Sequence, residues 1–152
     1  MTVGVLHEPI ELIQGAENVS TSRERISFAY LGPVEWDNMG DVHNGLWVHL
    51  APGTDWRFED IRMPGVVALI LDGGSTALSA IDPPKLAHAP YRPVASWGQT
   101  AYFDLSVQTL QRMASSQIIE LEFKADGVPA VRFTAGRGAR ETLVRYLHAR
   151  GY

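Results

Sequence analysis

The sequence predicts a mainly β domain of the α+β class, built as an antiparallel β-sandwich or strongly curved sheet with two short helices in its C-terminal half. Three observations lead to this fold class. Several short segments alternate apolar and polar side chains with period two. Most breaks between these segments are short turns rich in glycine, aspartate and proline, and short turns join antiparallel neighbours. A helical period appears only from Ser106 onward.

The first strands come from two alternating segments. "RISFAYL" places its isoleucine, phenylalanine and tyrosine on one face, as a half-buried strand does. "GPVEWDNMGD" follows, and its glycines and proline predict that this strand ends there. "LWVHL" alternates again, with Trp47 and His49 on the face opposite its leucines and valine.

The middle of the chain predicts a hairpin and a surface loop. Residues 66–71, "VVALIL", have no polar face, which is typical of a central strand covered on both sides. "DGG" at residues 72–74 permits the positive φ angles of a tight turn, and "STALSAI" returns as the partner strand. Residues 82–98 contain four prolines and no period, so we expect them to run over the surface before the strand "TAYFDL".

Two helices and a second hairpin are predicted in the last third. "SVQTLQRMAS" changes to a helical period, with Ser106 as its N-cap. "IIELEFKADGVPAVRF" predicts a hairpin that turns at residues 126–127, bringing the total to about seven strands. "GARETLVRYLHARGY" predicts an amphipathic helix, and its inner stripe is formed by Leu143, Val144 and Leu147.

Composition and charge exclude several classes of protein. The 152 residues fit one domain, residues 1–152, with residues 1–20 as a candidate extended N-terminal segment. The net charge of -4 counts against a nucleic-acid binder, which needs a dense positive patch. The absence of cysteine excludes disulfides, thiolate catalysis and cysteine zinc sites. No run approaches the roughly 20 apolar residues that span a bilayer.

The stretch "WDNMGDVHNGLWVHLAPGTDW", residues 36–56, gathers three of the four tryptophans with histidines and aspartates. Aromatic side chains supply rigid, amphipathic contact area of the kind that interfaces use. We expect this stretch to be a ligand- or partner-binding surface, with neighbours from the long loop. Its residues are Trp36, Asp37, Asp41, His43, Trp47, His49, Trp56, Tyr91 and Trp97. Competing interpretations are core packing by the tryptophans and turn formation by "DNMGD" and "HNG".

A catalytic interpretation of the same stretch is an alternative. Asp41, His43 and His49 carry ligand atoms that Zn²⁺ or Fe²⁺ accepts, so a metal-assisted or acid–base hydrolase is one hypothesis. Their spacing matches no metal motif, and the chain lacks the Gly-x-Ser-x-Gly nucleophile elbow. "AGRGAR" before the last helix lacks the Lys-Ser/Thr of a Walker loop, so a loop and helix start is the simpler interpretation. The sequence therefore names no cofactor and no catalytic residue, and it favours binding over catalysis.

Three segments in this order, "YLGPVEWDNMG…GLWVHLAPG", "LILDGG" and "AYFDLSVQTLQRMASSQIIELEF", resemble small uncharacterised proteobacterial envelope proteins of exported or lipoprotein type. The resemblance spans residues 30–133 and concerns their layout. It implies a mature periplasmic domain tethered upstream of Met1. The sequence departs from such proteins in having no lipobox and no anchoring cysteine, and the resemblance supplies no catalytic residues.

We therefore expect a non-catalytic binding domain of the bacterial cell envelope, with a protein or envelope component as its partner. Periplasmic localisation requires an export signal that was removed, because "MTVGVLHEPIELI" has no basic n-region and no long apolar h-region. If Met1 is the native start, the protein is cytoplasmic. The acidic charge then favours an inhibitor or immunity-type protein that pairs with a basic toxin.

Overall fold

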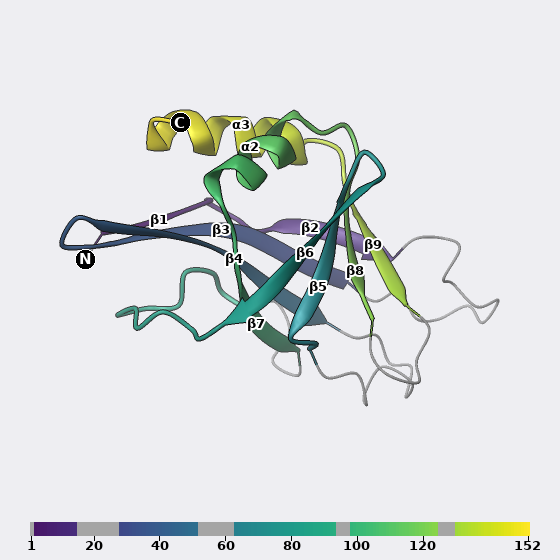
Figure 1. Cartoon of the computed structure of the whole chain (residues 1–152), viewed down its shortest axis with the longest axis horizontal. Helices are drawn as coiled ribbons and strands as arrows, with labels where there is room; N and C mark the ends of the chain where they lie inside the picture. Colours follow the sequence, from purple (N-terminus) through teal and green to yellow (C-terminus); the bar gives the residue numbers. More distant parts are fainter. Residues whose placement is uncertain (1, 15–27, 52–62, 94–97, 125–129) are drawn as a thin grey trace.

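A sheet that closes on itself forms the body of the protein, with two helices together on one side of it (Figure 1). The computed structural model describes residues 2–14, 28–51, 63–93, 98–124 and 130–152. The strands are β1 (Thr2–Val5), β2 (Ile10–Gln14), β3 (Phe28–Asn38), β4 (Asp41–Ala51), β5 (Val66–Leu71), β6 (Gly74–Ile81), β7 (Gln99–Asp104), β8 (Ile119–Phe123) and β9 (Val131–Ala135). The helices are α2 (Val107–Ser115) and α3 (Ala139–Arg150).

Eight of these strands make a closed antiparallel barrel. Their order is β3-β2-β9-β8-β5-β6-β7-β4, and pairing of β3 with β4 completes the ring. The predicted mainly antiparallel β fold with two C-terminal helices is confirmed. The predicted sandwich or curved sheet is replaced by a barrel, because the two ends of the sheet meet. Alternation along single strands carries no information about that closure.

Strand β3 is longer than the sequence predicts. It continues through Gly32 and Pro33, where we expected a break, and ends only at Asn38. Pro33 is tolerated because it lies where β3 passes from one neighbour to the next: β2 pairs with residues up to Leu31, and β1 pairs from Val34 onward. A proline without a backbone N–H costs a sheet least at such a gap in the ladder.

The N-terminal segment forms two strands of the same sheet. Both β1 and β2 run antiparallel to β3 along one of its edges, and residues 6–9 bulge out between them opposite Gly32 and Pro33. Residues 2–14 of the candidate extended segment are therefore integrated in the fold. Beyond the ring, β1, residues 34–38 at the end of β3 and residues 41–44 at the start of β4 form a three-stranded extension. We call this extension the arm.

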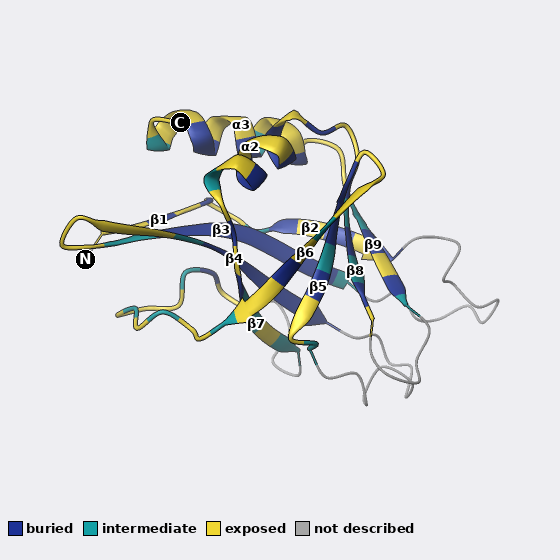
Figure 2. Cartoon of the chain, viewed as in Figure 1, coloured by how far each residue is buried: buried dark blue, intermediate teal, exposed yellow. Residues whose placement is uncertain are grey.

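Alternating side chains fill the barrel, and Figure 2 shows them as buried positions along the strands. The predicted inward positions of β8, Ile119, Leu121 and Phe123, are buried. In β5, Leu69, Ile70 and Leu71 are all buried, so only the second half of this strand is covered on both faces as predicted. The largest side chains with no exposure include Leu12, Leu31, Leu46, Leu69, Phe103, Leu121 and Phe133.

Both predicted helices are present, and the buried face of α3 differs from the prediction at one residue. Ser106 caps α2, since its hydroxyl accepts from the Thr109 N–H at 3.1 Å. In α3, Leu143 and Leu147 are buried as predicted, whereas the prediction for Val144 is wrong because it is 48% exposed. Tyr146 lies on the inner face instead, where it is buried and its hydroxyl donates to the Gly4 carbonyl of β1.

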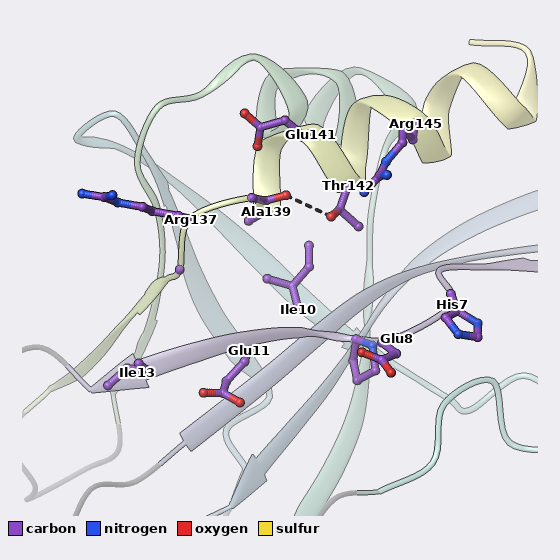
Figure 3. A pocket seen from close by; sticks show the side chains of 13 residues that line it. His7, Glu8, Ile10, Glu11, Ile13, Arg137, Ala139, Glu141, Thr142 and Arg145 are labelled. Carbon is purple, nitrogen blue, oxygen red and sulfur yellow. Dashed lines mark hydrogen bonds between the residues drawn. The ribbon is translucent and has the colours of Figure 1, made fainter.

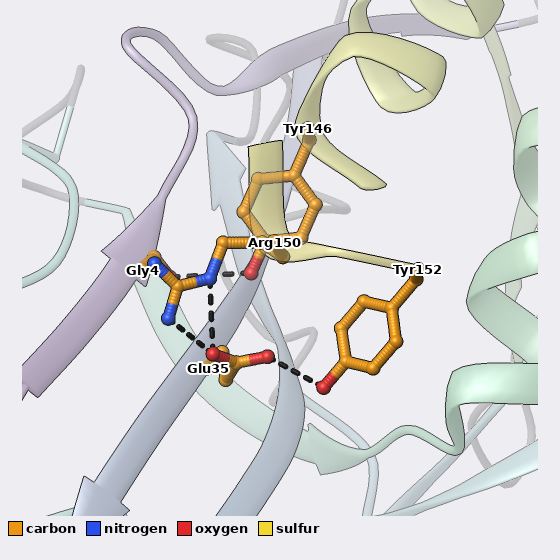
Figure 4. Close-up of polar contacts among 5 residues, drawn as sticks. All are labelled: Gly4, Glu35, Tyr146, Arg150 and Tyr152. Carbon is orange, nitrogen blue, oxygen red and sulfur yellow. Dashed lines mark hydrogen bonds and ion pairs between the residues drawn. The ribbon is translucent and has the colours of Figure 1, made fainter. Parts of the chain in front are cut away.

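A buried carboxylate joins α3 to the arm (Figure 4). Glu35 on β3 is paired with the Arg150 guanidinium, whose Nε lies 2.9 Å from Glu35 Oε1. The Tyr152 hydroxyl donates to the other carboxylate oxygen at 2.7 Å, and Tyr146 donates to the Gly4 carbonyl at 3.3 Å. Gly4 is small enough for the guanidinium to lie against it, since a Cβ there would lie 2.5 Å from Arg150 Cζ.

Removal of the guanidinium tests this joint. Arg150→Ala leaves Glu35 buried with Tyr152 alone, so we expect the free energy of unfolding to fall by roughly 3 kcal/mol. Tyr152→Phe removes one hydrogen bond to the same carboxylate and should cost only about 1.5 kcal/mol. Chemical denaturation measures both values. Equal losses in the two variants would mean that the ion pair does not hold α3 in place.

The opposite face of β3 is covered by the loop after β6. The Tyr91 hydroxyl donates to the Pro33 carbonyl at 2.6 Å and accepts from the Leu6 N–H at 2.9 Å. Its ring lies directly on Gly32, where a Cβ would overlap Tyr91 Cζ. Tyr91 therefore ties the end of β1 to β3 at the point where residues 6–9 leave the ladder.

We predict that Gly32→Ala destabilises the fold by about 2 kcal/mol, because its methyl group overlaps an aromatic ring that two hydrogen bonds hold in place. Gly65→Ala is the matched control, since a Cβ at Gly65 meets nothing within 4 Å. Thermal unfolding compares the two. A loss no larger than that of the control would show that Tyr91 is free to move away.

Candidate functional site

The outward face of β3 and β4 carries most of the predicted contact residues that the structure describes on these strands, whereas Asp37, which pairs with Val42, lies on the opposite face. His43, Trp47 and His49 alternate along β4, and Trp36 faces His43 across the pair with β3. Trp56 and Trp97 lie outside the described residues. The structure divides the remaining set into an enclosed part on the barrel and an exposed part on the arm.

The enclosed part contains Trp47 and His49, each 1% exposed. Their rings stack at 5.7 Å with an interplanar angle of 12°, and Tyr91 lies 5.0 Å from Trp47. His49 Nδ1 shares a 2.8 Å hydrogen bond with the Thr100 hydroxyl. Gly98 backs the imidazole, since a Cβ there would overlap the ring at its Cε1. Neither ring presents surface to a partner in this arrangement.

Tyr91 of the long loop lies beside the predicted site. The sequence identified it as a neighbour, and it does lie against Trp47, but as a cover over it. Burial raises the pKa of the Tyr91 phenol, so the hydroxyl stays a neutral donor to Pro33. The loop is thereby tied to the sheet.

The exposed part lies on the arm. Trp36 and His43 stack at 5.6 Å with an angle of 19°, and His43 Nε2 lies 2.9 Å from Asp41 Oδ2. Trp36 packs over Gly45, whose Cβ would come within 3.1 Å of the indole. These contacts hold an indole and an imidazole flat on the outer face of the arm, beside an exposed carboxylate.

Met39 at the tip of the arm is an exposed apolar residue that the sequence analysis did not single out. It is 100% exposed and adopts φ 57°, and Gly40 follows with φ 92°. Two positive φ angles define the type I′ hairpin turn, which favours Asn-Gly at these positions. The Asp37 carboxylate accepts from the Gly40 N–H at 2.6 Å and closes the turn. Val42, near the tip, is 48% exposed. A methionine at a turn position that prefers asparagine is the feature of the sequence that could have identified Met39.

Asp41, His43 and His49 do not meet as a metal site would require. His43 and His49 stand six residues apart on one strand, so they are separated by roughly 20 Å. Within the described ranges, no group of three or more candidate ligands lies close enough to hold a metal ion. The metal-assisted form of the hydrolase alternative therefore has no metal centre among the described residues.

A cavity of about 530 Å³ lies between β2 and the start of α3 (Figure 3). One wall includes Arg137 of the loop before α3 with Glu141 and Arg145 of α3. The other wall includes Glu8 of the segment between β1 and β2 and Glu11 of β2. A second cavity of about 610 Å³ continues from it between β1 and the rest of α3. The two share His7, Thr142 and Arg145 as lining residues. The sequence analysis reached only the glycine–arginine loop before α3 and assigned it no ligand.

Comparison with known proteins identified no relative of this chain. The chain matches no protein-family model, no curated protein and no solved structure. Neither helix in the described part of the chain is long and apolar enough to cross a membrane. The described residues form a closed antiparallel barrel with a helical cover and an exposed hairpin.

We predict that Trp47→Ala destabilises the protein by about 4 kcal/mol, because it empties a fully enclosed aromatic site. His43→Ala, on the exposed half of the same strand face, should cost less than about 1 kcal/mol. Denaturant unfolding followed by circular dichroism measures both. Similar stability of the two variants would mean that Trp47 is not part of the core.

Proposed function

We propose that the protein is a non-catalytic binding domain that contacts its partner with the tip of the arm. The observation that carries this proposal is the fully exposed Met39 in a left-handed backbone conformation. Such a conformation costs a non-glycine residue about 1 kcal/mol, and exposure of its side chain gives nothing back within the fold. A strained apolar residue at a projecting tip is typical of a side chain used in recognition.

The residues around Met39 indicate the chemistry of the partner. Val42 and the Trp36–His43 stack add apolar and aromatic surface on either face of the arm. Asp37 and Asp41 add negative charge next to the tip. A protein with an apolar recess and a basic rim would complement this surface. The contact set thus narrows the predicted stretch to its exposed half and adds Met39 and Val42.

The proposed setting is the bacterial cell envelope, on the resemblance of residues 30–133 in segment order. The acidic tip also suits an inhibitor of a basic protein in the cytoplasm, and the same arm would serve there. The two settings differ in where the chain resides. Fractionation of the native organism decides between them, when it is combined with the mass and N-terminus of the endogenous protein. A processed periplasmic or membrane species supports the envelope setting. A cytoplasmic species that begins at Met1 contradicts it.

Met39→Asn separates recognition from stability. Asparagine suits the turn, so we expect a gain of about 1 kcal/mol and a rise in Tm of roughly 3 °C. The same change removes an apolar anchor worth roughly 1.5–3 kcal/mol, which lowers partner affinity by about tenfold or more. Met39→Leu is the matched control, because it keeps both the strain and the apolar side chain.

A photo-crosslinking residue at position 42, used in the native organism, provides the binding measurement. We expect a discrete protein adduct both from the chain with Met39 and from its Met39→Leu variant, and loss of the adduct in the Met39→Asn variant. An adduct that survives Met39→Asn unchanged, or no adduct from position 42, would contradict the proposed contact surface. The same residue placed at position 144 on α3 controls for non-specific capture.

A further inference from the structure

The free edge of β1 opens onto the groove beneath α3. Within the described strands, β1 is the terminal strand of the sheet order and pairs with β3 alone. The cavity of about 610 Å³ is lined by residues 3–7 on one side and by Thr142, Arg145, Tyr146, Ala149 and Arg150 of α3 on the other. A strand edge therefore forms one wall of an elongated groove, and a helix forms the other.

The hairpin register decides which backbone groups of β1 face this groove. The turn at Met39–Gly40 has two residues, so the flanking pair Asn38–Asp41 is a hydrogen-bonded pair. Alternation then directs the even-numbered residues of β3 to β4 and its odd-numbered residues to β1. Gly4 pairs with Glu35 in this way. The N–H and C=O groups of Val3 and Val5 consequently point to the open edge.

The ladder position beside β1 lies in line with β9. Strand β9 pairs with β2 up to Ala135, and the Gly136 N–H still reaches the Glu11 carbonyl at 3.5 Å. The chain then leaves the sheet at Gly138, where φ is 92°, and returns as α3 across the arm. An added strand that continues the direction of β9 would run antiparallel to β1, which is the favourable geometry for strand addition.

Charge in the groove is of one sign beside β1. Among the residues that line this cavity, the charged side chains are Arg145 and Arg150, with no carboxylate. Arg150 forms an ion pair with Glu35. Arg145 is exposed and has no ion pair with a described residue. A carboxylate on the added strand would neutralise Arg145, which lies on the α3 wall midway between the two cavities.

We propose that this groove binds an extended acidic peptide, which adds to β1 as an antiparallel strand and directs a carboxylate to Arg145. Two copies of the chain suit the groove less well, because pairing through both β1 edges would bring two Arg145 side chains toward each other. This site is separate from the arm tip, and neither proposal depends on the other.

The probe is a display library of random decapeptides, selected in parallel on the unaltered protein and on Arg145→Glu. We expect the unaltered protein to enrich peptides with an acidic residue at a fixed position among β-forming residues. Arg145→Glu should enrich Lys or Arg at that position. Arg140→Glu is the matched control, because it makes the same charge change on the same helix but does not line the groove beside β1. It should retain the acidic consensus.

The best peptide is then titrated into isotopically labelled protein. We expect the amide signals of Val3 and Val5 to shift, and affinity to fall about tenfold or more in Val3→Pro, which removes an edge N–H without a bond to β3. Met39→Asn should bind the peptide normally, so failure of one proposal is distinguishable from failure of the other. The inference is overturned by no enrichment, by the same consensus on Arg145→Glu, by unchanged Val3 and Val5 amides, or by a concentration-dependent dimer that Val3→Pro dissociates.

Discussion

The pairing of β3 with β4 is the constraint on which the rest of the structure depends. It closes the eight-stranded ring, and it joins two strands that are longer than the ring needs. A closed barrel has no free edge, which removes the usual route to edge-to-edge aggregation. The surplus length of the two strands has to leave the barrel, and it does so as the arm, with β1 added along one side.

A projecting sheet exposes two faces, and the protein covers them by different means. On the inner face, α3 is held by an ion pair and a tyrosine hydroxyl around the buried Glu35. On the outer face, Tyr91 closes over Gly32 and Trp47 with two hydrogen bonds to backbone groups. Each cover needs a glycine beneath it, Gly4 in one case and Gly32 in the other, because a side chain there would collide with the cover.

Both covers stop short of the ends of the arm, and the two candidate surfaces lie where they stop. The tip extends past Tyr91 and α3, which leaves Met39 and Val42 in solvent. The edge of β1 is flanked but not paired by α3, which leaves a groove with Arg145 on its wall. The two candidate surfaces thus exist because the long hairpin extends beyond the elements that cover it.

Local patterns in the sequence determined much of the secondary structure. Period-two alternation located β4 and β8, and a continuous apolar run located β5. The "DGG" turn has its positive φ angles at Asp72 and Gly73, and Ser106 caps α2 as predicted. The same reasoning gathered Trp36, Asp37, Asp41 and His43 in one neighbourhood. Tertiary structure decided what local patterns do not encode. The two ends of the sheet meet, and β3 runs through Pro33 because its neighbouring strand changes there. Trp47 and His49 lie beneath a loop that is more than forty residues away in the chain. Alternation assigns a side chain to one face of a strand, but only the fold determines whether another segment covers that face.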